Sequence, residues 1–338
     1  MSFSGGSRYA VLGAGAWGTA LARQLAVAGR EVTLWAREPE VVAEVRERRE
    51  NGRFLPGISL PDSLAVTDDL REAVAGSPRV FVVIPSQYAR EVLRRIAPFL
   101  RPDAVLIVAS KGIEIGSLAL MTDICAEETP GRETAVLSGP SFAREVARGD
   151  PTAVVIAAAR LDLARTLQEE LSHGGLRLYT NSDLAGVQLA GALKNVFAVA
   201  AGVAAGLGFG SNTIAALITR SVAEMRRLGV AAGGRRETFD GLAGVGDLVL
   251  TCTGALSRNR RVGELIGQGL TPAEAVAQTR GVAEGVETSR SARDLALRHG
   301  VEMPIVEQVH AVLHAGRSAR EGITELMARR LRGEEEPA

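Results

Sequence analysis

Two lysines stand out among the basic residues of this sequence of 338 residues. Of its 39 basic side chains, only Lys111 and Lys194 are lysine, and the others are arginine. Arginine keeps its proton in proteins, whereas burial and neighbouring charges can lower the pKa of a lysine until it exchanges one. Lys111 and Lys194 are therefore candidates for proton chemistry, although biased codon usage would give the same count.

Lys194 lies in the middle of the apolar stretch 184–210, where helical spacing offers it no polar face. A buried ammonium must pair with a carboxylate, extend to solvent or release its proton more readily than a free lysine. We expect Asp247, which follows a glycine-rich turn, to supply that carboxylate; the alternative is an aspartate that caps a helix. The stretch predicts a buried helix rather than a membrane span, because Lys194 and Asn195 interrupt it and glycines break it up at positions 202, 206, 208 and 210.

A glycine-rich turn near the start of the chain predicts a dinucleotide site. The residues 13–18, GAGAWG, follow the apolar run 9–12 and precede a helical pattern over 19–28. In such a turn Gly13 permits the tight bend, Gly15 lets the backbone approach a pyrophosphate, and Gly18 lets the helix pack closely. The N-terminus of the helix then faces the anion.

The end of the next expected strand, 31–35, bears on the choice of cofactor. A site for NAD alone usually places Asp or Glu there for the ribose hydroxyls, but this chain has Arg37. Its guanidinium could hold a 2′-phosphate, which favours NADPH or the use of both cofactors. Glu38 could still serve the ribose, and the alternative for Arg37 is an exposed surface arginine.

The elements that must position these residues alternate between apolar runs and helical patterns. The runs expected to be strands are 9–12, 31–35, 64–67, 80–84, 105–109, 134–137, 153–157 and 176–179. Alternating strands and helices predict an α/β Rossmann-like domain with a doubly wound, mostly parallel sheet. Ligands bind beyond the carboxyl ends of such strands, where Lys111 and the segment 138–143 occur.

After Ser182 only helical patterns remain, so we expect an all-α second domain. The predicted divisions are 1–181 for the NAD(P)-binding domain, 182–331 for the helical substrate and catalytic domain, and 332–338 for a disordered tail. The cluster 257–261, SRNRR, suits a phosphate group, because arginine offers paired donors and serine and asparagine add single ones. The alternative is a solvated run of charges.

Composition narrows the choice of partners and compartment. The 39 acidic residues balance the 39 basic ones, so no broad basic field is available for nucleic acid or anionic membrane. Cys125 and Cys252 are too few for a disulfide framework and match no metal spacing, which favours a reducing cytoplasm. No signal peptide is expected. The four histidines lie outside the glycine-rich motifs, so a histidine is not expected to act as the base. The loop 51–57 is apolar at its centre and is expected to pack over the cofactor or the cleft.

Nine short motifs follow one another along nearly the whole chain: GAGAWGTALA, NGRFLPG, IPSQ, SKG, SGPSFA, ALKN, GVGDLVLT, SRNRR and VAEGV. Each motif alone is weak, but the ordered set resembles the bacterial-type NAD(P)-dependent glycerol-3-phosphate dehydrogenases. The resemblance implies reversible reduction of dihydroxyacetone phosphate to sn-glycerol 3-phosphate, for phospholipid synthesis, by a cytoplasmic homodimer. It implies NADPH or NADH as cofactor, with Arg37 favouring NADPH.

The resemblance also implies site residues. Lys194 would be the proton donor and acceptor, Lys111 would add positive charge nearby, and Asp247 would hold Lys194. Cofactor contacts would come from the glycine turn, Gly13, Gly15, Ala16, Trp17 and Gly18, and from Arg37, Lys111, Ala143, Arg258, Val282 and Glu284. Substrate contacts would come from Lys111, Gly139, Ser141, Lys194, Asn195, Asp247, Thr251, Ser257, Arg258 and Asn259. Ala16 departs from the family, which often has Ser or Thr there, so only a backbone N–H can serve the cofactor phosphate.

Two other functions stay open on the sequence. One is a related two-domain NAD(P) dehydrogenase that acts on 3-hydroxy acids or ketopantoate-like substrates. The pair of motifs GDLVLT and SRNRR argues instead for a phosphorylated substrate. The other is an NADPH-binding sensor without chemistry, which would leave Lys194 and Asp247 idle.

Overall fold

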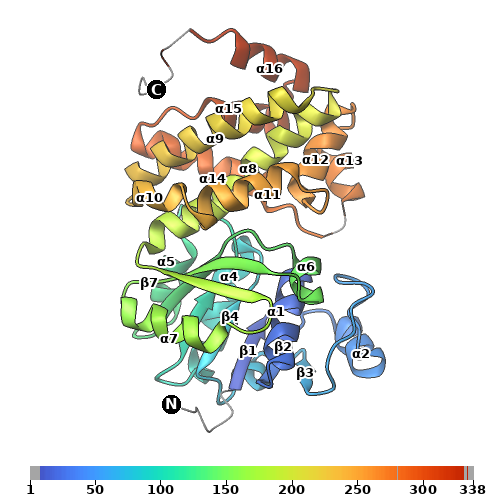
Figure 1. The fold of residues 1–338 in the computed structure, drawn as a ribbon, viewed down its shortest axis with the longest axis vertical. Helices are drawn as coiled ribbons and strands as arrows, with labels where there is room; N and C mark the ends of the chain where they lie inside the picture. The colour runs from blue at the N-terminus through green and yellow to red at the C-terminus, as the bar shows by residue number, and fades with distance from the viewer. Residues whose placement is uncertain (1–7, 280, 331–332, 334–338) are drawn as a thin grey trace. The chain divides into compact units, whose positions relative to one another are not determined.

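The computed structural model describes residues 8–279, 281–330 and 333 (Figure 1). It divides into two compact units, one made of Met1–Lys111 with Ala119–Gln188 and the other of Gly112–Leu118 with Leu189–Ala338. Of the predicted tail 332–338, all but Gly333 lies outside the described residues.

The first unit contains an eight-stranded sheet in the order β3-β2-β1-β4-β5-β6-β7-β8. Neighbouring strands are parallel except for β6 and β7, which are antiparallel. This order begins as the Rossmann order 3-2-1-4-5-6 does, so the predicted mostly parallel, doubly wound sheet is confirmed. The strands are β1 (Arg8–Leu12), β2 (Glu31–Trp35), β3 (Leu64–Thr67), β4 (Arg79–Val82), β5 (Val105–Val108), β6 (Glu133–Ser138), β7 (Thr152–Ala158) and β8 (Leu176–Asn181).

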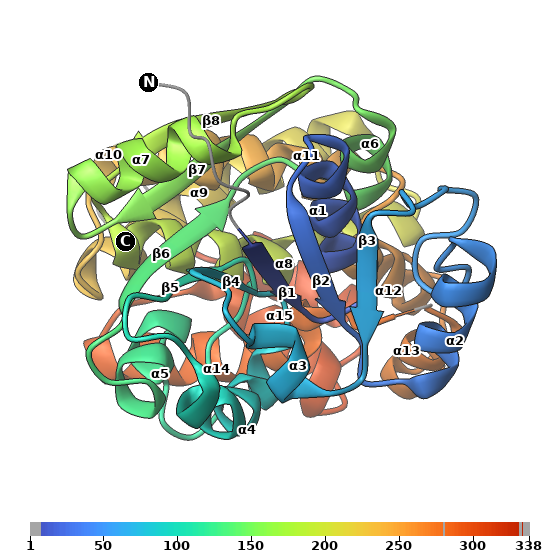
Figure 2. The ribbon, with the colours of Figure 1, turned by 90° about the horizontal axis from the view of Figure 1, so that it is seen from below.

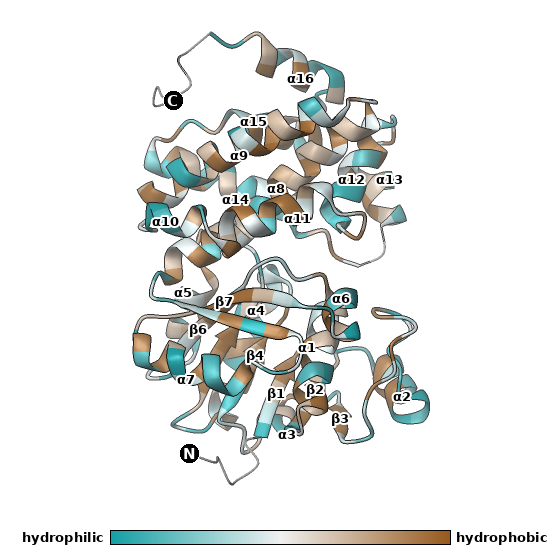
Figure 3. Ribbon diagram, in the orientation of Figure 1, coloured by the Kyte–Doolittle hydropathy of each residue, from teal (hydrophilic) through white to brown (hydrophobic). Residues whose placement is uncertain are grey.

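Helices cover both faces of this sheet. Figure 2 shows α1, α6 and α7 on one face and α3, α4 and α5 on the other. The strands are therefore buried on both sides, and a strand such as β5 is buried at all of its positions. In Figure 3 the strands carry mainly hydrophobic residues, whereas α2 is largely hydrophilic. The helices of this unit are α1 (Ala16–Val27), α2 (Pro39–Arg48), α3 (Leu70–Val74), α4 (Ser86–Ile96), α5 (Met121–Glu128), α6 (Ala143–Arg148) and α7 (Leu161–Leu171).

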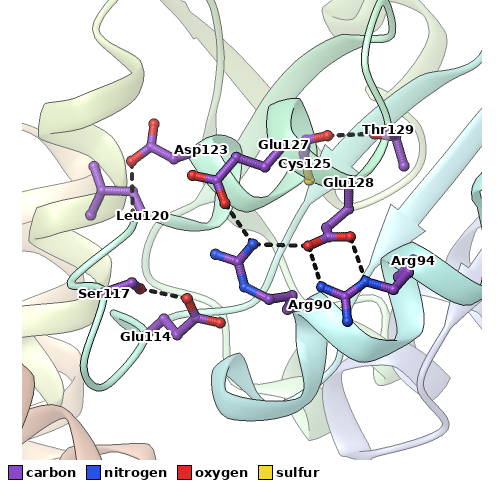
Figure 4. Close-up of polar contacts among 10 residues, drawn as sticks. All are labelled: Arg90, Arg94, Glu114, Ser117, Leu120, Asp123, Cys125, Glu127, Glu128 and Thr129. Carbon is purple, nitrogen blue, oxygen red and sulfur yellow. Dashed lines mark hydrogen bonds and ion pairs between the residues drawn. The ribbon is translucent and has the colours of Figure 1, made fainter.

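Polar groups fix several of these helices at their ends and sides. Asp69 caps α3 by accepting hydrogen bonds from the backbone N–H groups of the first turn. Arg90 and Arg94 of α4 both bind Glu128 of α5, with Nη1–Oε1 and Nε–Oε2 distances of 2.9 Å each (Figure 4). The hydrogen bonds from Arg94 contribute most to holding the pKa of Glu128 below its ordinary value.

The second unit is helical, and its described residues contain no strand. The predicted change from an α/β domain to an all-α domain is therefore confirmed. Its central element is α8 (Leu184–Gly206), which begins in the first unit and is almost wholly buried beyond Val187. By length and composition α8 could cross a membrane, but 83% of its most apolar window is buried inside the structure, as in a core helix. The other helices are α9 (Ser211–Ala231), α10 (Arg236–Phe239), α11 (Asp247–Thr253), α12 (Arg258–Gly267), α13 (Pro272–Gln278), α14 (Glu284–His299), α15 (Pro304–His314) and α16 (Ala319–Met327).

The glycines of α8 do not all act as predicted. The expectation that they break the run is wrong for Gly202, because α8 continues through it and ends only at Gly206. Gly208 does lie beyond the end of the helix, with φ of +86°, a conformation that glycine adopts without strain. Glycine inside a helix weakens it, so another contact must compensate for Gly202.

That contact is a close crossing of α8 with α12. A Cβ atom at Gly202 would lie 1.9 Å from the carbonyl oxygen of Arg260, and one at Gly263 would lie 2.0 Å from that of Val199. Four residues further along each helix, a Cβ atom at Gly206 would lie 2.2 Å from the carbonyl oxygen of Glu264, and one at Gly267 would lie 2.4 Å from that of Val203. The two backbones therefore touch without an intervening side chain, which fixes the register of α8 against α12.

Candidate active site

The turn between β1 and α1 has the geometry that its glycines predict. Gly13 has φ of +114°, and a Cβ atom there would lie 2.5 Å from the carbonyl oxygen of Val83. At Gly18 a Cβ atom would lie 1.9 Å from the carbonyl oxygen of Gly13. Neither position can hold a side chain, because the chain bends sharply at Gly13 and the helix packs against the turn at Gly18.

Gly15 has the opposite environment. No atom lies within 4 Å of the place where its Cβ would be, so a side chain would fill open space rather than clash. Gly15 is also the N-cap of α1, where no side chain caps the helix and no acidic residue occupies the first turn. The Nε1 atom of Trp17 is buried without a hydrogen-bond partner. Open space, uncapped N–H groups and an unsatisfied donor suit the pyrophosphate of a dinucleotide.

Arg37 follows the end of β2 and carries the cation expected there. Its Nη2 atom lies 2.8 Å from Oε1 of Glu38, and the two side chains are 70% and 19% exposed. An arginine this exposed is free to turn toward a ligand, and it supplies a paired donor that matches a phosphate. Glu38 offers carboxylate oxygens beside it. The end of β2 therefore carries both the guanidinium expected for a 2′-phosphate and the carboxylate expected for a ribose.

Lys111 and the segment after β6 lie at neighbouring strand ends, as expected. The Nζ atom of Lys111 donates to the carbonyl oxygen of Gly139 at 3.2 Å, and Ser141 Oγ donates to the same oxygen at 3.0 Å. Gly139 has φ of +143°, and a Cβ atom there would lie 3.0 Å from Cα of Val154. The close approach of β7 therefore requires glycine at this position. Ala143 begins α6 directly after this segment.

In the second unit the structure brings Lys194 and Asp247 together. Lys194 Nζ donates to Oδ1 of Asp247, and it donates to Thr251 Oγ1 at 2.9 Å. Thr251 Oγ1 in turn donates to the main-chain carbonyl of Asp247 at 2.6 Å. The side chains of Lys194 and Asp247 are 8% and 1% exposed. The buried ammonium thus has the carboxylate partner predicted for it, and Thr251 accepts a hydrogen bond from a second of its N–H groups.

These three side chains come from two helices, α8 and α11, and their positions follow from the local sequence. Lys194 lies in the middle of α8, flanked by fully buried residues such as Leu193 and Phe197. Asp247 is the first residue of α11, directly after the short π-helical segment Leu242–Gly246. Because Asp247 and Thr251 are four residues apart on α11, they share one face and meet Lys194 together.

Asn195 and Asn259 form a second buried polar group beside Lys194. Asn259 Nδ2 donates to Oδ1 of Asn195 at 2.9 Å, and its Oδ1 accepts from the N–H of Gly285 at 2.9 Å. A Cβ atom at Gly285 would lie 2.4 Å from the carbonyl oxygen of Asn195. The starts of α12 and α14 are therefore fastened to α8 at the residue that follows Lys194.

The expected phosphate cluster is divided between helix capping and an exposed cation. Ser257 caps α12 by accepting from the N–H of Arg260 at 3.2 Å. Arg258 is exposed, and a Cβ atom at Gly281 would lie 2.6 Å from its Nη1. Its guanidinium thus lies against the segment that leads to Val282, which is 48% exposed, and to Glu284. Arg258, expected to bind both substrate and cofactor, therefore lies near Val282 and Glu284, which are expected to bind the cofactor.

Sequence reasoning missed two residues that hydrogen-bond to the glycine turn. Asn51 and Thr19 both donate to the carbonyl oxygen of Ala14, at 2.8 and 3.1 Å. The apolar loop 51–57 was a signal that this segment packs on something, and Leu55 does pack with Ala20 and Ala147. No pattern in the sequence indicated which atom Asn51 would reach.

Comparisons with known proteins agree over nearly the whole chain. Residues 8–164 match the model of the NAD-dependent glycerol-3-phosphate dehydrogenase N-terminus, and residues 183–324 match that of its C-terminus. Glycerol-3-phosphate dehydrogenase [NAD(P)+] of Citrifermentans bemidjiense is 56% identical over 330 residues, which cover 97% of this chain and 98% of that protein. That of Geobacter sulfurreducens is 54% identical over the same share of each. The crystal structure of the Coxiella burnetii glycerol-3-phosphate dehydrogenase has a TM-score of 0.93 at 40% identity, covering 96% of this chain and 99% of that one.

Proposed function

Because the chain belongs to the NAD-dependent glycerol-3-phosphate dehydrogenase family, we propose that it reduces dihydroxyacetone phosphate to sn-glycerol 3-phosphate, reversibly, with NADH or NADPH. The product would supply phospholipid synthesis. The observation that carries the proposal is the buried group of Lys194, Asp247 and Thr251, in which a carboxylate and a hydroxyl hold an ammonium group that can act as a proton donor. Dehydrogenases for 3-hydroxy acids or ketopantoate-like substrates are not favoured, since both parts of the chain match one family.

The proposed mechanism assigns the proton to Lys194. When bound, the reduced nicotinamide supplies a hydride to C2 of the ketone. Lys194 donates a proton from Nζ to the carbonyl oxygen as negative charge develops there. Asp247 and Thr251 accept hydrogen bonds from the same Nζ, so they hold the ammonium group in place. In the reverse reaction Lys194 accepts the proton from the alcohol.

The remaining residues bind and orient the two ligands. Lys111 adds positive charge near the developing oxyanion, and Arg258 grips the phosphate with paired donors. Binding energy from the phosphate, which does not react, orients the ketone. The other proposed substrate contacts are Gly139, Ser141, Asn195, Ser257 and Asn259. The proposed cofactor contacts are Gly13, Gly15, Ala16, Trp17, Gly18, Arg37, Lys111, Ala143, Arg258, Val282 and Glu284.

The test is turnover of dihydroxyacetone phosphate with NADH and with NADPH, followed by loss of nicotinamide absorbance. Lys194→Arg keeps the charge but resists deprotonation, so it should lose most of the activity. Dihydroxyacetone without the phosphate should show a lower kcat as well as a higher KM. Near wild-type turnover by Lys194→Arg would show that Lys194 is not the acid, and no turnover of any ketone by the wild type would favour a sensor.

We also propose a homodimer in the cytoplasm and a domain boundary between residues 181 and 182. The cysteines support a reducing compartment, because Cys125 and Cys252 are both free thiols. Light scattering of the purified protein would give the oligomeric state. Fractionation of the producing cells would locate the protein, and separate expression of residues 1–181 would test the boundary.

A further inference from the structure

The carbonyl oxygen of Ala14, inside the glycine turn, accepts two side-chain hydrogen bonds. Asn51 Nδ2 donates to it at 2.8 Å and Thr19 Oγ1 at 3.1 Å. Asn51 Nδ2 also donates to Thr19 Oγ1 at 2.9 Å. Both side chains are fully buried, with 0% exposure. A buried carbonyl that receives two donors is held firmly in one direction.

The orientation of Asn51 is itself fixed by the loop that carries it. Its Oδ1 accepts from the N–H of Phe54 at 3.2 Å, and its main-chain oxygen accepts from the N–H of Leu55 at 2.8 Å. Since the side-chain oxygen faces Phe54, the amide nitrogen must face Ala14 and Thr19. Leu55 of the same loop and Ile58, which follows it, pack in a buried cluster, so the loop is anchored in the core.

This network determines where the next N–H points. Across a trans peptide the carbonyl of Ala14 and the N–H of Gly15 point in opposite directions. With the carbonyl held toward Asn51 and Thr19, the N–H of Gly15 points away from them. No hydrogen-bond acceptor for this N–H occurs in the described part of the chain. It is a free donor beside the open space at Gly15.

We propose that Asn51 is a positioning residue for the dinucleotide: it orients the Ala14–Gly15 peptide so that the N–H of Gly15 is presented to the pyrophosphate. Asn51 does not touch the cofactor and acts only through the backbone of the turn. The inference rests on the proposed use of NADH and NADPH. Both dinucleotides contain the same pyrophosphate, so Asn51 should affect their binding equally.

Asn51→Asp is the sharpest perturbation, because it has nearly the same shape and keeps the acceptor for Phe54. It loses the donor to Ala14 and sets a carboxylate oxygen against a carbonyl oxygen. The dissociation constants of NADH and NADPH should each rise about tenfold, by the same factor, as expected for the loss of one oriented donor to a charged group. Fluorescence titration of the reduced nicotinamide measures both constants on the whole protein, and thermal unfolding of the apoprotein reports its stability.

A second pair of variants covers the case in which a buried carboxylate prevents folding. Thr19→Val is nearly isosteric and removes one donor to Ala14 together with the acceptor for Asn51. It should weaken both dinucleotides equally, by a smaller factor than Asn51→Asp. Thr19→Ser keeps the hydroxyl and should bind both as the wild type does.

The possible results distinguish a failure of the positioning role of Asn51 from a failure of the proposed cofactor use. Variants that melt earlier but bind both dinucleotides with wild-type constants would show that the network is only structural, and so would overturn the inference. A loss confined to NADPH would also overturn it, because that result would point to the 2′-phosphate instead. Wild-type protein that binds neither dinucleotide would refute the cofactor use itself, and the inference with it.

Discussion

Glu224 of α9 offers a quantitative prediction about stability and pH. This carboxylate is 3% exposed and accepts from the N–H of Ile305 at 2.8 Å and of Val306 at 3.4 Å, in the first turn of α15. Burial raises its pKa from 4.5 to about 7, although these hydrogen bonds and the charges of Arg227 and Arg220 act in the other direction. The folded chain therefore keeps a proton on Glu224 that the unfolded chain releases.

The sign and size of the effect follow from this difference in pKa. Between pH 4.5 and about 7 the folded state binds more protons than the unfolded state, so the free energy of unfolding falls as pH rises. The stabilising contribution is complete below pH 4.5 and is lost above about pH 7. At about 1.4 kcal/mol for each pKa unit, the loss amounts to about 3 kcal/mol.

Glu224→Gln tests this contribution, because a glutamine oxygen can still accept from Ile305 but the side chain does not titrate. We expect the free energy of unfolding of the wild type, relative to the variant, to fall by about 3 kcal/mol between pH 4.5 and pH 8. Urea unfolding followed by circular dichroism at several pH values measures it. Glu237→Gln, an exposed change of the same charge, is the matched control. Parallel pH profiles for the wild type and Glu224→Gln would refute the reasoning.

Three further outcomes are expected. Asp247→Asn leaves the buried Lys194 without its charge partner, so kcat should fall about a hundredfold while cofactor affinity is unchanged; stopped-flow kinetics and fluorescence titration would show both. Gly263→Ala drives a methyl group into the α8 backbone and should lower the free energy of unfolding by about 1–3 kcal/mol in urea titrations, whereas Gly322→Ala, inside α16 at ordinary contact distances, should not. Arg37→Gln should reduce kcat/KM for NADPH about tenfold and leave the value for NADH, and equal losses would remove Arg37 from the 2′-phosphate site.

The sheet could be predicted from the sequence because its strands are buried on both faces. Such strands appear as short apolar runs, as β5 does, and the turn Gly13–Gly18 marked the first βα connection. The pairing of Lys194 with Asp247 was also predictable, because an ammonium on an apolar helix requires a carboxylate, and Asp247 followed a glycine-rich turn in an apolar context.

Contacts between segments distant in sequence could not be predicted. Whether Gly202 ends a helix or admits another backbone depends on α12, which begins more than fifty residues later. The role of Asn51 likewise depends on a carbonyl oxygen in a turn near the start of the chain. The helical pattern also predicted a start at Thr19, whereas α1 begins at Ala16, inside the glycine motif.

The touching backbones of α8 and α12 also set a length. Lys194 lies on α8 and Asn259 on α12, and these are the proposed acid and a proposed phosphate ligand. If either helix slid, a side chain would replace a glycine against the carbonyl oxygens of the other helix, so the distance between the ammonium and the amide is fixed. Ketones whose phosphate lies more bonds from the carbonyl should therefore be poorer substrates, because the backbone contact fixes this distance. Side-chain substitutions around the site should do little to extend the range of substrates.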